Sequence, residues 1–310
     1  MLGKLEQTIV DVVDNILPCV VSVSTTVLAR IDLFNLAPVQ GQGSGIIIDE
    51  EGLILTNAHV VKKAQKVEVQ LHNGKKLEAV VLGSMREQDI AIIKVPKDKD
   101  LKVIKLGESR SLKVGQFAIA LGNALGLGVS VTFGLVSALN RTIGTPEIQL
   151  EGLIQTTADI NPGNSGGALL NTSGELIGIP TAVIQHSQGM GFAIAVDSIK
   201  GVLEEFRRSG KISTPWLGVI GYTIDSKLAN YYKLAIEKGA LILDVPDGPA
   251  KKAGIKQGDI IIEFNGEVVE SIQMLTQKIS KLRIGDEISL KVLRESEIID
   301  FTINLDRAPN

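Results

Sequence analysis

Short apolar segments separated by tight turns make up the N-terminal two thirds of the chain. Asn73-Gly74 is a typical two-residue hairpin signal between two alternating segments. The segments leave little room for crossover helices, so the pattern predicts antiparallel barrels or sandwiches. The expected strands are Val20–Ser24, Gly45–Asp49, Leu53–Thr56, Val67–Leu71, Leu77–Leu82, Ile90–Val95, Phe117–Gly122, Val129–Leu139, Leu169–Leu170, Leu176–Ile179 and Gly191–Val196.

The first residues follow a different period. Leu5, Ile9 and other apolar residues recur at helical spacing, so residues 4–17 predict an amphipathic helix that ends at Pro18. After the first strand, the segment through Gln42 has no clear period and is expected to be irregular.

A second helix and a domain boundary are expected after the strands. Asp197-Ser198 is a suitable N-cap for a helix that Gly210 would end. Lys211–Pro215 has no apolar period, so we expect one domain over 1–210, a linker over 211–215 and a second domain over 216–310. The second domain is expected to be α+β, with helices around Leu228–Leu234, from Asp247 to Gly254 and over Ser271–Leu282, and strands Ala240–Val245, Ile260–Phe264, Glu287–Leu293 and Ile298–Leu305.

Composition excludes several classes of protein. The 310 residues suffice for two domains, and with 4% aromatic residues their cores must be largely aliphatic. A net charge of −3 gives no reason to expect binding to nucleic acid or anionic membranes. The single cysteine, Cys19, excludes an internal disulfide and is expected to be buried and inert. Three histidines and one cysteine cannot form a Cys₂His₂-type zinc site, so no metal is expected.

One glycine-rich stretch, Asn161-Pro162-Gly163-Asn164-Ser165-Gly166-Gly167, points to chemistry. Helix and regular strand are both unfavourable there, and glycine lets a ligand approach the main chain closely. A serine displayed beside backbone N–H groups suits acyl transfer, because the hydroxyl attacks a carbonyl and the N–H groups stabilise the oxyanion. A glycine-rich surface turn is the alternative interpretation.

A serine nucleophile needs a base, and His59 is the best candidate. It follows a predicted strand, where a polar imidazole interrupts an apolar run. Asp89 opens another apolar strand, where a carboxylate has no packing purpose. A buried aspartate is costly unless it is hydrogen-bonded, and an imidazole N–H is a suitable partner that the aspartate would orient. The alternative for His59 is a core histidine with a structural partner.

The remaining histidines fit less well. His72 lies at a predicted hairpin tip and His186 in a polar loop, so both are expected to be structural or solvated. The serine stretch also matches the Gly-x-Ser-x-Gly elbow of α/β-hydrolases, which requires a helix after the serine and the acid and histidine later in the chain. Here strand and turn follow Ser165, and the order His59, Asp89, Ser165 is that of chymotrypsin-type enzymes.

The chain resembles the HtrA family of serine proteases. Its three signatures are Thr56–Val61, Asp89–Val95 and the segment from Gln155 to Gly167. The resemblance implies a mainly β fold, a chymotrypsin-like double β-barrel followed by a small α+β PDZ domain. It also implies a triad of His59, Asp89 and Ser165, and an oxyanion hole formed by the N–H groups of Gly163 and Ser165.

The C-terminal part resembles a PDZ domain. Trp216-Leu217-Gly218-Val219 matches the loop whose N–H groups receive a peptide carboxylate, and the following strand and the helix at Ser271–Leu282 would form the groove. A folded spacer without a ligand is the alternative.

Three positions depart from the family pattern. Thr157 stands where aspartate is common, with Asp159 close by, Ala168 where proline is frequent, and Pro180 where asparagine often lies near the substrate pocket. These departures concern loop contacts and specificity rather than the triad.

The resemblance implies an ATP-independent endopeptidase for unfolded or damaged proteins, with a regulatory, peptide-binding PDZ domain, a preference for aliphatic side chains, a homotrimer and no cofactor. An inactive holdase chaperone or peptide-sensing adaptor is the alternative. Charged residues interrupt the N-terminal apolar positions and no apolar stretch is long enough to span a membrane, so a cytoplasmic or peripheral protein is expected, or one of the cell envelope if a targeting segment is missing.

Overall fold

A computed structural model of the chain describes residues 2–30, 36–123, 128–144, 149–161, 163–181, 190–210, 212, 215–225, 228–229, 236–280 and 282–308. They form two compact units, of which the first comprises Met1–Gly144 and Leu150–Ile212 and the second contains Ser213–Asn310. Each unit is described by itself.

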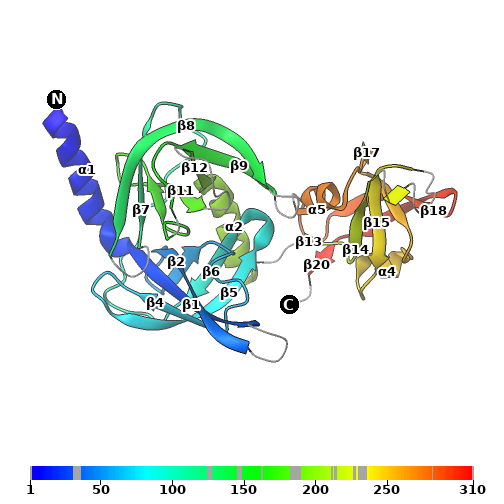
Figure 1. The fold of residues 1–310 in the computed structure, drawn as a ribbon, viewed down its shortest axis with the longest axis horizontal. Coiled ribbons are helices and arrows are strands. Elements are labelled where there is room, and N and C mark those ends of the chain that lie inside the picture. Colours follow the sequence, from blue (N-terminus) through cyan, green and yellow to red (C-terminus); the bar gives the residue numbers. More distant parts are fainter. Residues whose placement is uncertain are drawn as a thin grey trace. The chain divides into compact units, whose positions relative to one another are not determined.

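The first unit contains two closed antiparallel barrels (Figure 1). In the first barrel the strand order is β1-β2-β3-β6-β5-β4, and in the second it is β10-β11-β12-β9-β8-β7. The strands of the first are β1 (Val20–Arg30), β2 (Leu36–Ile47), β3 (Leu53–Thr56), β4 (Lys66–Gln70), β5 (Lys76–Met85) and β6 (Ile90–Lys94). Those of the second are β7 (Phe117–Gly122), β8 (Ser130–Gly144), β9 (Gln149–Thr156), β10 (Ala168–Leu170), β11 (Leu176–Thr181) and β12 (Gly191–Ala195).

Helices flank the barrels. α1 (Leu2–Ile16) leads through a short 3₁₀ turn, η1 (Leu17–Cys19), into β1, and Val12 and Ile16 on its inner face join the core. α2 (Val196–Ser209) packs on β11 and β12 and ends at Gly210, whose left-handed backbone (φ 70°) closes the last turn. A second 3₁₀ turn, η2 (Arg86–Gln88), precedes β6.

Aliphatic side chains fill the cores, as expected. Each barrel has its own interior cluster, around Val69 and Ile93 in the first and Leu169 and Ile177 in the second. The largest cluster contains buried residues of both barrels and of α1 and α2, so it joins the barrels into one body.

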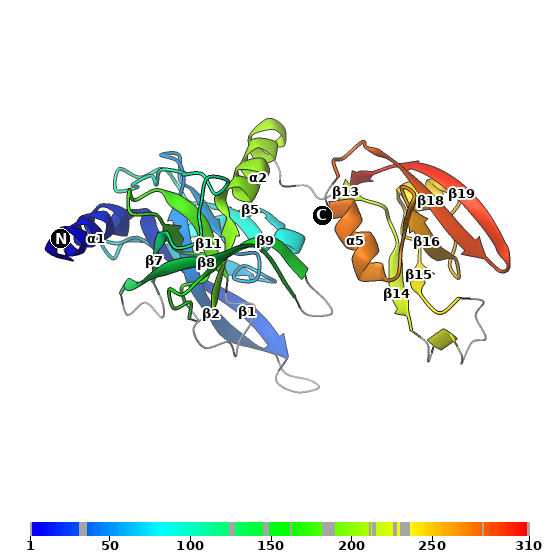
Figure 2. The same cartoon turned by 90° about the horizontal axis from the view of Figure 1, so that it is seen from above.

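The second unit is a small α+β sheet domain. α5 packs against β14 and β15 and lies along the sheet in Figure 2. The sheet order is β14-β15-β16-β18-β19, with β17 paired to β16 and a separate β13–β20 pair. The elements are β13 (Pro215–Trp216), β14 (Ile220–Ile224), β15 (Gly239–Asp244), α4 (Pro249–Ala253), β16 (Ile260–Phe264), β17 (Glu267–Val268), α5 (Ile272–Ser280), β18 (Glu287–Arg294), β19 (Glu297–Asn304) and β20 (Asp306–Arg307).

Three expectations about elements are wrong. The segment expected to be irregular contains the long β1–β2 hairpin, which pairs from Val20↔Ile46 to Arg30↔Leu36. Its outer end leaves Leu28 and Val39 exposed, so one-sided burial imposes no alternation there. β9 was not expected, because Gly152 (φ 67°) interrupts its alternation.

The third concerns the start of α2. Ala195 is its N-cap and makes no side-chain capping bond. The carboxylate of Asp197 instead accepts hydrogen bonds from the N–H and hydroxyl of Ser109 and the N–H of Arg110. The helix expected around Leu228–Leu234 lies largely outside the described residues.

Candidate active site

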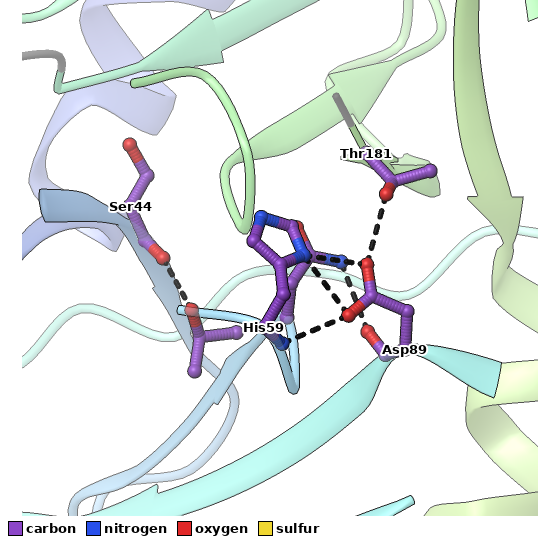
Figure 3. A network of polar contacts seen from close by, with 6 residues as sticks. Ser44, His59, Asp89 and Thr181 are labelled. Carbon is purple, nitrogen blue, oxygen red and sulfur yellow. Dashed lines mark hydrogen bonds and ion pairs between the residues drawn. The ribbon is translucent and has the colours of Figure 1, made fainter. Parts of the chain in front are cut away.

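His59 and Asp89 form a close hydrogen-bonded pair on the first barrel (Figure 3). His59 lies in the turn after β3, and Asp89 lies between η2 and β6 with a left-handed backbone (φ 53°). Nδ1 of His59 is 3.0 Å from Oδ1 and 2.8 Å from Oδ2 of Asp89. A carboxylate only accepts, so Nδ1 carries the proton and Nε2 of the neutral ring is an acceptor, as a general base requires.

The carboxylate of Asp89 is buried, whereas the imidazole of His59 reaches solvent. Their side chains are 6% and 42% exposed, respectively. The carboxylate also accepts hydrogen bonds from the His59 N–H (3.0 Å) and from the hydroxyl of Thr181 (2.9 Å). Its burial is therefore compensated by three donors, and the carboxylate holds the Nδ1 side of the imidazole ring.

Thr181 was not among the residues singled out from sequence. It closes β11 of the second barrel, so its hydroxyl bridges the two barrels at the Asp89 carboxylate (Figure 3). A threonine at the end of an apolar strand carries little sequence signal, because the contact joins residues that are far apart in the chain.

The segment 163–167, which carries Ser165 and is called the serine loop here, is tightly folded. Gly163 (φ 109°) and Gly166 (φ 83°) adopt conformations that favour glycine. The N–H of Asn164 donates to Asn161 O (3.0 Å), that of Gly167 to Asn164 O (2.9 Å) and that of Gly166 to Pro180 O (3.2 Å). Ser165 is 4% exposed, so the loop is part of the packed structure and not a projecting surface turn.

The serine loop lies against the segment that carries His59. A methyl group on Gly166 would come within 2.5 Å of the hydroxyl of Thr56, three residues before His59. One on Gly43 would come within 2.7 Å of the Val60 side chain and 3.3 Å of the Ser165 carbonyl oxygen. The structure thus places the serine loop beside Thr56 and Val60, which lie before and after His59 in the chain.

A second residue missed from sequence, Ser44 of β2, binds the serine loop. Its N–H donates to the Ser165 carbonyl (2.8 Å) and its hydroxyl to the Gly163 carbonyl (2.6 Å). Both bonds join the first barrel to the loop of the second.

Thr157, one of the departures from the family pattern, and the nearby Asp159 both support neighbouring backbone. The hydroxyl of Thr157 accepts from the N–H of Leu135 (2.9 Å). The backbone carbonyl of Asp159 accepts from Thr132 (2.8 Å) and from the Asn164 side chain (3.3 Å).

The Trp216–Val219 loop begins at the last residue of β13 and leads into β14 of the second unit. Leu217 is buried and its carbonyl accepts from the N–H of Ala250 (2.8 Å). Gly218 has φ 87°, and the Trp216 ring covers Gly248, where a Cβ would come within 2.4 Å of the ring. This packing gives the loop a defined backbone.

The other candidate residues lie elsewhere. His72 is exposed in the β4–β5 turn, and His186 lies outside the described residues. Cys19 is buried, and burial raises the pKa of its thiol to about 11, although Lys102 partly opposes the shift. The described ranges hold no group of His, Cys, Asp and Glu side chains that could bind a metal ion, and none of their helices is long and apolar enough to cross a membrane.

Comparisons with known proteins agree with this architecture. Residues 43–179 match the trypsin-like peptidase domain family and residues 218–305 match the PDZ domain family. A probable periplasmic serine endoprotease DegP-like from Chlamydia trachomatis is 41% identical over 272 residues, covering 86% of this chain and 54% of the relative. The periplasmic pH-dependent serine endoprotease DegQ of Escherichia coli is 39% identical over 274 residues, covering 87% and 60%. The chain thus spans little more than half the length of such relatives.

Solved structures are similar over nearly the whole chain. The HtrA-type protease AlgW with decapeptide has a TM-score of 0.70 at 31% identity, covering 97% of this chain and 99% of that one. The serine endoprotease from Yersinia pestis has a TM-score of 0.66 at 33% identity, covering 96% and 97%.

These findings confirm the expected fold class and correct the expected location. A cytoplasmic or peripheral protein is the wrong expectation, because the relatives are named periplasmic endoproteases, which points to the cell envelope. The chain belongs to the HtrA family of serine proteases, with a trypsin-like peptidase domain followed by a PDZ domain.

Proposed function

We propose that this chain is an ATP-independent serine endopeptidase that cleaves unfolded or damaged proteins in the cell envelope. The observation that carries the proposal is the buried Asp89 carboxylate bound to Nδ1 of a half-exposed His59, next to the serine loop. A buried charge that orients one side of an imidazole and leaves the other side accessible suits proton transfer to and from a substrate.

In the proposed reaction, the Ser165 hydroxyl attacks the peptide carbonyl while Nε2 of His59 takes its proton. Asp89 holds the ring and stabilises the imidazolium. The N–H groups of Gly163 and Ser165 stabilise the oxyanion, and His59 then returns the proton to the leaving amine. Water repeats the sequence to release the acyl group. These steps need no metal or organic cofactor.

Labelling by a fluorophosphonate and cleavage of reduced casein test the nucleophile. We expect both in the wild type and neither in Ser165→Ala. Equal labelling of Ser165→Ala would refute the assignment. If the wild type cuts nothing while Ser165→Ala suppresses aggregation as well as the wild type does, the chain is a holdase.

We further propose that the Trp216–Val219 loop binds peptide C-termini and regulates cleavage. β14 is the edge strand of its sheet and α5 packs beside it. This arrangement allows a peptide to add to the sheet as a further strand. Trp216 is the only tryptophan, so its fluorescence reports on the loop. A peptide with a free carboxylate should change the emission and the same peptide with a C-terminal amide should not; equal responses would contradict carboxylate recognition.

A homotrimer is also proposed. Phe117 and Phe133 on β7 and β8 stack at 5.0 Å between ring centroids and remain 38% and 42% exposed, beside exposed Leu135 and Val131. Such an apolar patch is available for burial between copies. Sedimentation should give a trimer for the wild type and smaller species for Phe133→Glu; a wild-type monomer at micromolar concentration would contradict the proposal.

The domain boundaries are proposed as 1–210 and 216–310 with a linker over 211–215. The division of the chain into compact units between Ile212 and Ser213 supports them. Limited proteolysis within 211–215 that releases two folded fragments would test this boundary.

A further inference from the structure

Ser44 is a fully buried polar residue at the junction of the two barrels, with a relative exposure of 0%. It lies on β2 of the first barrel, and every polar group that it carries is engaged. Its N–H donates to Ser165 O at 2.8 Å. Its carbonyl accepts from the hydroxyl of Thr56 at 2.7 Å, the bond drawn from Ser44 in Figure 3. Its hydroxyl makes two further bonds.

The direction of the hydroxyl bonds follows from their partners. The N–H of Asn123, which follows β7, donates to Ser44 Oγ at 2.7 Å. The hydroxyl proton is therefore directed to the other neighbour, the carbonyl oxygen of Gly163, at 2.6 Å. One buried hydroxyl thus connects the end of β7 to the serine loop.

Ser44 holds the carbonyl groups of the two residues whose N–H groups form the proposed oxyanion hole. The peptide between Gly163 and Asn164 is held at both ends, its carbonyl by Ser44 Oγ and its N–H by Asn161 O. The peptide between Ser165 and Gly166 is held likewise, by the N–H of Ser44 and by Pro180 O. Rotation of either peptide plane would leave buried polar groups without partners.

Glycine at 163 makes this restraint necessary. With φ at 109° and no Cβ, Gly163 has access to more backbone conformations than any other residue would. An oxyanion hole stabilises the transition state only if its donors are in place before the reaction. The hydroxyl of Ser44 is placed to restrain the peptide that follows this glycine.

We propose that Ser44 is a positioning residue for catalysis. Its hydroxyl holds the carbonyl of Gly163 and thereby fixes the loop backbone, so that the oxyanion donors are preorganised. This inference rests on the proposed peptidase function. Ser44 acts through the loop and not on the substrate, so its loss should affect the transition state more than substrate binding.

Kinetics of Ser44→Ala on a peptide substrate test the inference. We expect kcat to fall about 10- to 100-fold, less than for a direct oxyanion donor, with KM within about twofold. Affinity for a peptide aldehyde, whose adduct carries the oxyanion, should fall in parallel with kcat/KM. Affinity for the uncleaved peptide, measured in Ser165→Ala with and without Ser44→Ala, should not change.

Ser137→Ala is the matched control. The Ser137 hydroxyl is also buried, but it has no hydrogen-bond partner among the described residues. The control should keep wild-type kcat, which separates loss of the Gly163 bond from loss of a buried hydroxyl. The pH profile of Ser44→Ala should keep the wild-type midpoint, because the His59–Asp89 bonds are not altered.

Each outcome decides the inference. Wild-type kcat in a folded Ser44→Ala, or an equal loss in Ser137→Ala, would overturn it. If Ser44→Ala does not fold, Ser44→Cys replaces it, because a thiol fills the site but donates only weakly. Its kcat should still fall, and wild-type kcat there would likewise overturn the role. If the wild type shows no cleavage that depends on Ser165, the proposed function fails first and the inference with it.

Discussion

Two buried aspartates, one in each unit, have partners of different chemistry. Asp89 is 4% exposed and Asp259 is 1% exposed. Asp89 is bound by the imidazole and N–H of His59 and by the hydroxyl of Thr181. Asp259 accepts hydrogen bonds from Nε and Nη2 of Arg294, at 2.7 and 2.8 Å.

The difference between them lies in the partner. Arg294 carries a permanent charge, donates also to Gly254 O and lies 5.8 Å from the centre of the Phe301 ring, so its pair with Asp259 is a fixed structural unit. Hydrogen bonding to Asp259 raises the pKa of Arg294 further. An imidazole can accept and release a proton during a reaction whereas a guanidinium cannot, and the ring of His59 is open to solvent. A buried carboxylate is thus a candidate for catalysis when its partner can exchange a proton, as an imidazole can and a guanidinium cannot.

The largest expected effect is on the proposed catalytic pair, His59 and Asp89. Asp89→Asn should lower kcat about 10⁴-fold at neutral pH, because an amide no longer fixes the tautomer of His59 or stabilises the imidazolium. Peptide hydrolysis measures this effect, and thermal unfolding verifies the fold. Activity within tenfold of the wild type would show that Asp89 has no catalytic role and does not differ from Asp259 in this respect.

The next effect is on the structural pair. Asp259→Ala should lower the free energy of unfolding of the second unit by about 3 kcal/mol, because Arg294 loses its buried partner. Denaturant unfolding followed by the fluorescence of Trp216 measures it. Replacing both partners, in Asp259→Asn with Arg294→Met, should cost less than the single change. Hydrolysis of a short peptide should be unaffected; a kcat loss like that of Asp89→Asn would show that the two aspartates do not differ in kind.

A smaller effect is expected at the bond between barrels. Thr181→Val removes the hydroxyl that holds Asp89 and should lower kcat about tenfold through misorientation of the carboxylate. Thr181→Ser keeps the donor and should retain most of the activity. A similar kcat in Thr181→Val and the wild type would show that the Thr181 hydroxyl does not contribute to catalysis.

The smallest effect concerns a third carboxylate, Asp197. Its burial raises its pKa, but hydrogen bonds from Ser109 and Arg110 outweigh burial and lower the pKa below its usual value. A lowered pKa stabilises the fold at pH values above the unfolded-state pKa of about 3.9, and this contribution is lost as the pH falls through the folded pKa. Asp197→Asn should therefore cost about 1 kcal/mol at neutral pH and progressively less in acid. If the melting temperatures of the wild type and Asp197→Asn differ as much at acidic pH as at neutral pH, the prediction is contradicted.

Much of the fold could be predicted from local pattern. Strands with consecutive buried residues, such as β7 and β16, were predicted with correct ends because their apolar residues are nearly continuous. The outer β1–β2 hairpin and β9 could not be, because solvent reaches both faces of the former and Gly152 breaks the alternation of the latter. Asp197 had the residue type of an N-cap, and only its distant partners show that it binds another loop.

The sequence by itself determined the fold class, the family and the candidate residues His59, Asp89 and Ser165, because glycine-rich turns and polar residues in apolar runs are local features. Only the tertiary structure decided that Thr181 completes the carboxylate site and that Ser44 holds the serine loop. Serine and threonine on strands have no distinctive local signal, and their roles depend on which backbone and carboxylate groups the packing of the two barrels brings within hydrogen-bond distance.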